Sequence, residues 1–210
     1  MRYLITILFI FLFTGQSIGQ NNSLQTAAGV SMSNIAGDGR YTYFISHFLN
    51  LSYYRQINNS LSFGLGAEYS LKGGDYSYGT LLDTSTYIYY KGNLRLHYLI
   101  IPVSARVYWR NFILASNIYT GIKLYATGQS LSSMYINNQS VVHAIADSKL
   151  IKEAYNKPLL GFGVGIGYYF NKSMIELSYS RDIISIDNLN DYKFLNTDFK
   201  LAYYITIAEL

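Results

Sequence analysis

The three histidines, His47, His97 and His143, are the side chains best suited to acid–base chemistry in this chain. A hydrolytic or acyl-transfer site would place one of them beside a serine, with a carboxylate such as Asp147 to orient it. No Gly-x-Ser-x-Gly segment presents such a serine. A zinc site is also disfavoured, because the chain has no cysteine and no two histidines fall at ligand spacing. We therefore predict no catalytic, cofactor-binding or metal-binding residues, and no cofactor.

A second group of reactive side chains consists of charged residues that alternate with apolar ones. Alternation puts them on one face of a strand, opposite a row of leucine, phenylalanine and tyrosine. Charges enclosed on such a face must pair, because an unpaired buried charge is very costly. Their pairing predicts a salt-bridged plug, with a proton or ion path as the other interpretation. The residues expected on this face are Glu68, Lys72, Glu176 and Lys200, with Arg95 and His97 as further candidates.

Segments with this alternation recur along the chain and predict eight strands. The strands are expected at residues 24–34, 43–57, 61–72, 94–109, 112–125, 160–170, 175–183 and 198–207. The gaps between them are alternately short (58–60, 110–111, 171–173) and long (35–42, 73–93, 126–157, 186–193). Short turns on one side and long loops on the other are typical of an antiparallel barrel threaded through a membrane.

Composition supports a barrel with one face in lipid. Only 13% of residues are charged and 50% are hydrophobic, whereas about 25% of the residues of soluble domains are charged.

Residues 1–19 are predicted to be a secretory signal peptide, with Arg2 before an apolar run that is too short to span a bilayer. The barrel domain is then 20–210. The net charge of +4 is dispersed, without the basic cluster of a nucleic-acid-binding protein.

Five local patterns add detail to the predicted barrel. Gly161, Gly163, Gly165 and Gly167 alternate with large apolar residues, which predicts an inward face without side chains that leaves room for large neighbours. The alternation slips at Pro102, which predicts a β-bulge there. Residues 141–155 could form a short helix, and 84–90 could prolong a hairpin beyond the bilayer. Aromatic residues precede the three short turns and predict a girdle at the membrane edge: Tyr53, Tyr54, Tyr108, Trp109, Tyr168, Tyr169 and Phe170.

Several segments resemble the PorT-like outer-membrane β-barrel family of Bacteroidota. They are GVSMSN at 29–34, LSFGLGAEYSLKG at 61–73 and YLIIP at 98–102, followed by the glycine-rich strand at 161–167 and the segment 175–181. The order and spacing of the segments carry the likeness, which covers essentially the whole chain after the signal peptide. The resemblance implies an eight-stranded outer-membrane barrel. It implies no shared catalytic residues.

These patterns together predict an all-β protein, an eight-stranded antiparallel up-and-down transmembrane β-barrel of OmpX/OmpA-like architecture. We expect it in the outer membrane of a Gram-negative cell, exported through a cleaved signal peptide, in a structural or interaction role. Its partners would be outer-membrane lipids, the barrel-insertion machinery and a protein bound by the exposed loops 73–93 and 126–157. The alternatives are a membrane-embedded lipid-modifying enzyme, a component of a secretion apparatus, and a soluble periplasmic barrel with an apolar interior.

Overall fold

The computed structural model describes residues 22–36, 41–81, 86–136, 139–146, 158–184 and 195–210. The predicted signal peptide lies outside these residues. The described part of the chain forms ten strands, and none of its segments is a helix that could cross a membrane. The strands are β1 (Asn22–Ala36), β2 (Tyr41–Thr42), β3 (Phe44–Asn58), β4 (Leu61–Leu81), β5 (Thr86–Trp109), β6 (Phe112–Ile136), β7 (Gln139–Ala146), β8 (Leu159–Phe170), β9 (Ser173–Asp182) and β10 (Leu195–Glu209).

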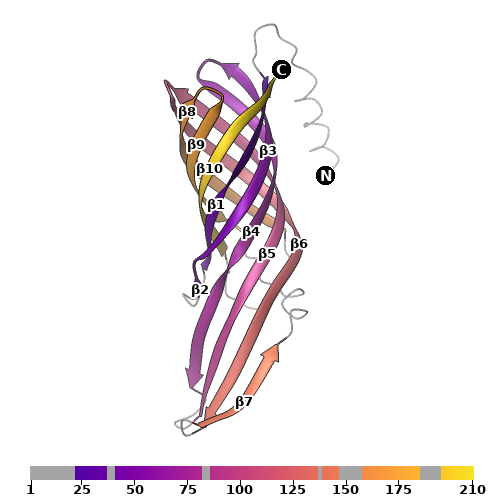
Figure 1. Ribbon diagram of the computed structural model, residues 1–210, viewed down its shortest axis with the longest axis vertical. Coiled ribbons are helices and arrows are strands. Elements are labelled where there is room, and N and C mark those ends of the chain that lie inside the picture. Colours follow the sequence, from indigo (N-terminus) through magenta and orange to yellow (C-terminus); the bar gives the residue numbers. More distant parts are fainter. Residues whose placement is uncertain (1–21, 37–40, 82–85, 137–138, 147–157, 185–194) are drawn as a thin grey trace.

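Eight of these strands close into a ring. Each pairs antiparallel with its neighbours in the order β1, β3, β4, β5, β6, β8, β9 and β10, and β10 returns to β1 with Val30 opposite Leu201. Backbone bonds between Asn22 and Leu210 tie the two ends of the described chain together at the end of the barrel where the short turns lie (Figure 1). The predicted eight-stranded up-and-down barrel is confirmed.

The three short turns are where the alternating gap lengths place them. They are formed by Asn59–Ser60, by Arg110–Asn111 and by Asn171–Lys172. Arg110 and Asn171, the first central residues of the second and third turns, have positive φ angles of 55° and 53°, as in the two-residue hairpin turns whose backbone matches the right-handed twist of the strands.

The opposite end of the barrel carries an extended sheet that we call the arm. Here β4, β5 and β6 run on past the other strands, so that Leu81 lies opposite Tyr87 and Thr86 opposite Ile136. β2 pairs with one edge of this sheet, along β4, and β7 with the other, along β6. We define the arm as residues 75–81, 86–93, 129–136 and 139–146, and Figure 1 shows it projecting well beyond the ring.

The arm corrects two expectations about the long loops. Much of 73–93 and of 126–136 is strand and not loop. For the part that begins at Thr86, this agrees with the predicted extension of a hairpin over 84–90. The helix predicted at 141–155 is wrong for 141–146, which are β7; residues 147–157 lie outside the described part. β-branched Val141, Val142 and Ile145 favour a strand, and the free edge of β6 offers hydrogen bonds to it.

The barrel wall is apolar outside and polar inside. Leu177 and Leu201 face outward, with 53% and 49% of their surfaces exposed, and Leu65 lies on the same outer face. On β5 the outward apolar row runs from Leu99 to Trp109, which is ~33 Å along the strand and ~25 Å in height at a strand tilt of ~40°. That height matches the apolar band of a membrane barrel.

The predicted β-bulge at Pro102 is wrong. Ile100, Pro102 and Arg106 all point inward, so β5 keeps one phase through the proline. The register shift lies between His97 and Tyr98, where β6 contains one extra residue. What changes at Pro102 is the chemistry of the inward face, which is apolar before it and polar after it, and this change imitates a slip in alternation.

The inward glycines of β8 leave room for large neighbours, as expected. Gly161, Gly163, Gly165 and Gly167 are all buried on the inner face. A Cβ at Gly161 would collide with the ring of Tyr119, and one at Gly163 would press on the amide of Asn117. The narrow barrel thus accommodates inward side chains from β6 because these four positions of β8 contribute none.

The aromatic girdle is present but is built by only part of the predicted set. Neighbouring outward rings form a row from Trp109 through Phe112, Tyr168 and Phe170 to Tyr203, with centroids 5.4–6.4 Å apart. Consecutive residues of a strand face opposite sides, so Tyr54, next to the outer residue Tyr53, is buried in the lumen instead.

Candidate functional site

The lumen of the barrel holds three layers of ion pairs, stacked between the short-turn end and the arm. They contain four of the charged residues that were predicted to point inward: Glu68, Lys72, Glu176 and Lys200. Each comes from a strand that alternates strictly, so one face is committed to the lumen. Three further charged residues, Arg106, Asp182 and Asp198, complete the layers.

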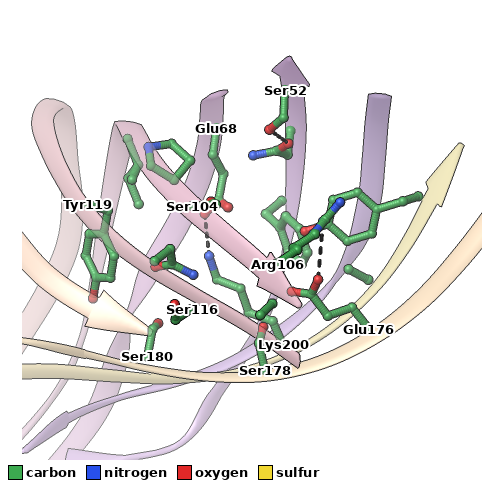
Figure 2. A pocket seen from close by; sticks show the side chains of 18 of the residues that line it. Ser52, Glu68, Ser104, Arg106, Ser116, Tyr119, Glu176, Ser178, Ser180 and Lys200 are labelled. Atoms are coloured by element: carbon green, nitrogen blue, oxygen red, sulfur yellow. Dashed lines mark hydrogen bonds and ion pairs between the residues drawn. The ribbon is translucent and has the colours of Figure 1, made fainter. Parts of the chain in front are cut away.

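The first layer, nearest the short turns, is centred on Arg106 (Figure 2). Its guanidinium donates to Gln25 Oε1 at 2.8 Å and to Glu176 Oε2 at 3.3 Å. It also lies 3.9 Å from the centre of the Tyr54 ring and 4.7 Å from that of Tyr204. Arg106 is 1% exposed, so its charge is balanced within the protein.

Sequence reasoning missed Arg106, although a signal was present. Ala105 and Val107 flank it as outward residues, which assigns Arg106 to the polar inner face. The supposed bulge at Pro102 obscured this assignment.

The second layer is the ion pair between Lys200 and Glu68, and Figure 2 shows it beside the first layer, across the lumen. The Lys200 ammonium also lies 4.9 Å from the centre of the Phe48 ring. A cavity of about 50 Å³ adjoins both layers and is lined by hydroxyl and amide groups, including those of Ser52, Ser104 and Asn117. One water needs roughly 10–15 Å³ of such volume, so the cavity has room for a few waters.

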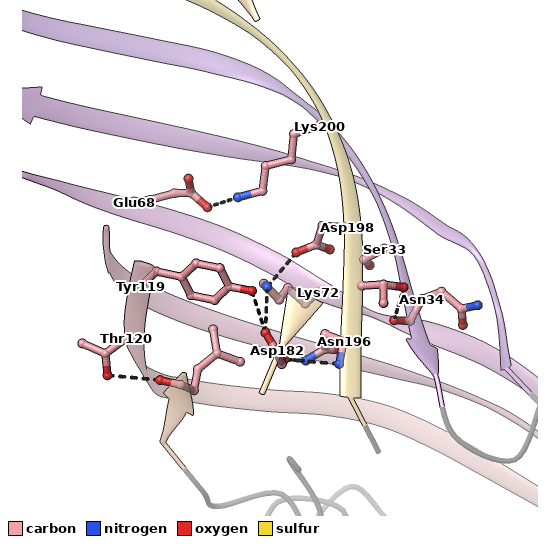
Figure 3. A network of polar contacts seen from close by, with 12 residues as sticks. Ser33, Asn34, Glu68, Lys72, Tyr119, Thr120, Asp182, Asn196, Asp198 and Lys200 are labelled. Carbon is pink, nitrogen blue, oxygen red and sulfur yellow. Dashed lines mark hydrogen bonds and ion pairs between the residues drawn. The ribbon is translucent and has the colours of Figure 1, made fainter. Parts of the chain in front are cut away.

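The third layer lies toward the arm and contains the deepest charges (Figure 3). Lys72 Nζ is 2.6 Å from Asp198 and 3.5 Å from Asp182, and these side chains are 0–1% exposed. Asp182 also accepts hydrogen bonds from Tyr119 Oη at 2.9 Å and from Asn196 Nδ2 at 2.8 Å. Asp182 lies near the end of the alternating segment 175–183, and Asp198 begins the segment 198–207. Their inward phase could therefore be inferred from the sequence, but their convergence on Lys72 could not.

An apolar cluster fills the lumen beside the third layer. It consists of Ile35, Leu94, Leu96, Tyr98, Ile100, Tyr119, Ala126 and Leu159. The interior is therefore not uniformly polar as expected: the inward face of β5 is apolar toward the arm. This cluster shields the Lys72 layer from solvent on that side, which strengthens its ion pairs by lowering the local dielectric constant.

Arg95 and His97 do not point inward, which corrects the two further candidates. Both lie on the outer face of β5, in phase with Leu99. Arg95 pairs with Asp75 at 2.6 Å. His97 Nδ1 is hydrogen-bonded to Tyr69 Oη at 2.7 Å, and its ring stacks on Tyr125 with centroids 3.7 Å apart.

The other histidines do not assemble a nucleophile–base pair in the described part of the chain. His47 lies on the outer face of β3, opposite Val30 of β1. The side chain of His143 and all of Asp147 lie outside the described residues. Among the described residues, no group of three or more histidine, aspartate or glutamate side chains could hold a metal ion.

The lumen is best suited to holding the barrel together. The ion-paired residues contribute three cations and four carboxylates from four strands, β4, β5, β9 and β10, so the layers link wall segments that are distant in sequence. An eight-stranded barrel has an interior just wide enough for its own side chains. The interior charges also contradict a soluble barrel that carries an apolar ligand, since that would require apolar walls around an empty lumen.

No family model and no curated protein matches this chain. Solved structures with a similar course of the chain include Neisserial surface protein A, with 8% identity over 89% of this chain and 99% of that one and a TM-score of 0.49. Ail of Yersinia pestis in complex with a heparin analogue has 14% identity over 90% and 99% of the two chains, and a TM-score of 0.42. The outer-membrane protein OprG from Pseudomonas aeruginosa has 13% identity over 91% and 95%, and a TM-score of 0.38.

Proposed function

We propose that this protein is an integral outer-membrane β-barrel of structural or interaction type, without catalytic activity. The observation that carries the proposal is its polarity: an apolar band ~25 Å high surrounds a lumen filled with ion pairs. In water this arrangement would expose a continuous belt of leucine, isoleucine and aromatic side chains while burying charge. In a bilayer the belt contacts lipid, and the barrel wall keeps the paired charges of the lumen away from the hydrocarbon.

The lumen acts as a plug in this proposal, in preference to a proton or ion path. Three successive layers of paired charges and the apolar cluster occupy the interior. A diffusing ion would have to break several buried pairs, each of which costs roughly 3–5 kcal/mol to disrupt. The segments at 29–34, 61–73 and 98–102 support placing the chain with the PorT-like barrels of Bacteroidota, in which it would be exported through the signal peptide at 1–19.

The arm is the surface through which such a barrel would meet a partner. It carries Tyr76, Tyr87, Tyr89 and Tyr90 on a sheet that stands outside the ring of eight strands. Tyrosine contributes rigid amphipathic contact area and is favoured in recognition surfaces. With the short turns in the periplasm, the arm faces the outside of the cell.

Single-cysteine labelling tests both the insertion and the orientation, since the chain has no cysteine of its own. We would make Leu81→Cys at the tip of the arm, Lys172→Cys in a short turn and Leu177→Cys in the apolar band, and treat intact cells with a membrane-impermeant maleimide. Leu81→Cys should react in intact cells, Lys172→Cys after the envelope is opened, and Leu177→Cys only in denaturant. Reaction of Leu177→Cys in the folded protein, without denaturant, would show that the band faces water and would contradict the proposal.

A shortened arm tests the interaction role separately. Ser77 and Lys91 are directly opposite each other, so replacing residues 78–90 with Asn-Gly closes the hairpin with a favoured two-residue turn. The barrel should still insert, whereas cross-linked partners recovered from outer-membrane extracts should be lost. Unchanged partners in this variant would exclude the tip of β4 and β5 as the contact surface.

A further inference from the structure

A polar groove crosses the outer face of the chain at the base of the arm. It has a volume of about 640 Å³ and is lined by residues of β2, β4, β5 and β6. Its polar side chains include Thr42, Asp75, Lys91, Asn93, Arg95 and Gln129. Hydroxyl, amide, carboxylate and cationic groups therefore face one open space, which the plug and the apolar band do not use.

The groove lies just beyond the apolar band, on the side of the wall that faces lipid. On β5 the band begins at Leu99, so Arg95 is four residues and Lys91 eight residues beyond it. At ~3.3 Å per residue and a tilt of ~40°, these residues stand ~10 Å and ~20 Å above the hydrocarbon edge. Phospholipid headgroups occupy only about 5–8 Å there, so the groove reaches above the headgroups of ordinary phospholipids.

The charges of the groove favour an anion. Arg95 is held in place by Asp75 at 2.6 Å, by the Gly74 carbonyl at 3.1 Å and by the Phe44 ring, whose centre lies 3.6 Å from the guanidinium carbon. Lys91 is exposed and makes no ion pair with any residue in the described ranges. Two cations and one carboxylate leave one net positive charge, with Lys91 available to a ligand.

The neutral groups of the groove favour a ligand rich in hydroxyls. The side-chain amide of Gln129 can donate and accept hydrogen bonds. Asn93 Oδ1 accepts from the backbone N–H of Gln129 and Thr42 Oγ1 donates to the Asp75 carbonyl, which leaves the Asn93 Nδ2 donor and the Thr42 hydroxyl oxygen as an acceptor. A bare phosphate would use the cations alone and leave most of the groove empty.

We propose that this groove binds an anionic saccharide. Two sources have this chemistry: the sugar headgroup of a glycolipid in the outer leaflet, and a soluble acidic polysaccharide at the cell surface. The inference rests on the proposed function, because the groove stands above a membrane only if the barrel spans one.

Two binding experiments distinguish the sources. Barrel in phosphatidylcholine nanodiscs would be titrated with a short oligogalacturonate by calorimetry, with neutral maltohexaose as the comparison sugar. In parallel, barrel extracted from vesicles containing rough lipopolysaccharide would be assayed for lipopolysaccharide that co-purifies. The test variants are Lys91→Gln and Gln129→Ala. The matched control is Lys172→Gln, which removes an exposed lysine from a short turn at the other end of the barrel.

Removing one charge-assisted hydrogen bond at an exposed site should weaken binding about tenfold. We expect this loss for Lys91→Gln, a smaller one for Gln129→Ala, none for Lys172→Gln, and weaker binding of maltohexaose. Dependence on Lys91 in either experiment supports the inference and identifies the source. No binding in both, or equal binding by Lys91→Gln and Lys172→Gln, overturns it. If cysteine labelling still reports an inserted barrel, the proposed function survives that failure.

Discussion

Neutralising Arg106 should destabilise the barrel more than any exposed substitution. Arg106→Met leaves Glu176, which is 5% exposed, without its closest cation and leaves Gln25 Oε1 without its donor. Breaking a buried pair from one side costs about 3–5 kcal/mol, and the lost contact with the Tyr54 ring adds about 1 kcal/mol. We expect a total loss of about 5 kcal/mol in the free energy of unfolding.

Removing both partners should cost much less than removing one. In Arg106→Met with Glu176→Met no charge of the pair remains unpaired, and apolar replacement of a buried pair is often neutral. The double variant should therefore lie within about 2 kcal/mol of the unchanged protein. Lys172→Met is the matched control, because its pair with Glu209 is 3.7 Å long and well exposed, and such pairs contribute less than about 1 kcal/mol.

The assay is urea unfolding in phospholipid vesicles, followed by tryptophan fluorescence. The chain has a single tryptophan, Trp109, which stands in the outer aromatic row with 70% of its surface exposed. It reports departure from the lipid without a label. A cost for Arg106→Met of under about 1 kcal/mol, or a double variant as unstable as the single one, would refute the view that the instability comes from leaving Glu176 unpaired.

Three other substitutions test separate features of the barrel. Gly73→Ala should lower the free energy of unfolding by about 1–3 kcal/mol in the same assay, because Gly73 has φ of +148° and a Cβ would strike the Leu94 carbonyl. Gly121→Ala, with ordinary φ and a nearest contact of 3.1 Å, should cost less, and equal costs would contradict the backbone argument. Leu177→Arg, within the apolar band, should lower the free energy of unfolding by about 2–4 kcal/mol, whereas Leu81→Arg on the arm should leave it nearly unchanged. Equal losses of stability in the two variants would mean that the band does not contact lipid. Gly161→Val should abolish the heat-sensitive gel mobility of the folded barrel, because the valine side chain would occupy the space of the Tyr119 ring. Adding Tyr119→Ala to the same chain should partly restore this mobility. A Gly161→Val variant that folds would show that Tyr119 does not need that space.

The sequence by itself determined that the strands form a closed barrel and which face of its wall is apolar. Side chains alternate with a period of two on any strand, so Leu177 and Glu176 had to face opposite sides whatever the tertiary structure. The short gaps fixed antiparallel neighbours because a two-residue turn cannot connect strands in any other way. Glu68, Lys72, Glu176 and Lys200 could therefore be assigned to the lumen from local pattern alone.

Only the tertiary structure decided which inward residues meet and how far the strands extend. Lys72, Asp182 and Asp198 belong to three different strands, and barrel closure and stagger place them in one layer. The arm could not be predicted from the sequence, because tyrosine- and serine-rich segments are compatible with a loop as well as with a strand. They form strands here because the edges of neighbouring strands supply hydrogen bonds. The inward apolar residues of β5, from Leu94 to Ile100, misled the assignments at Arg95, His97 and Pro102. Burial inside a closed ring and burial in lipid select the same apolar side chains, and sequence alone does not distinguish them.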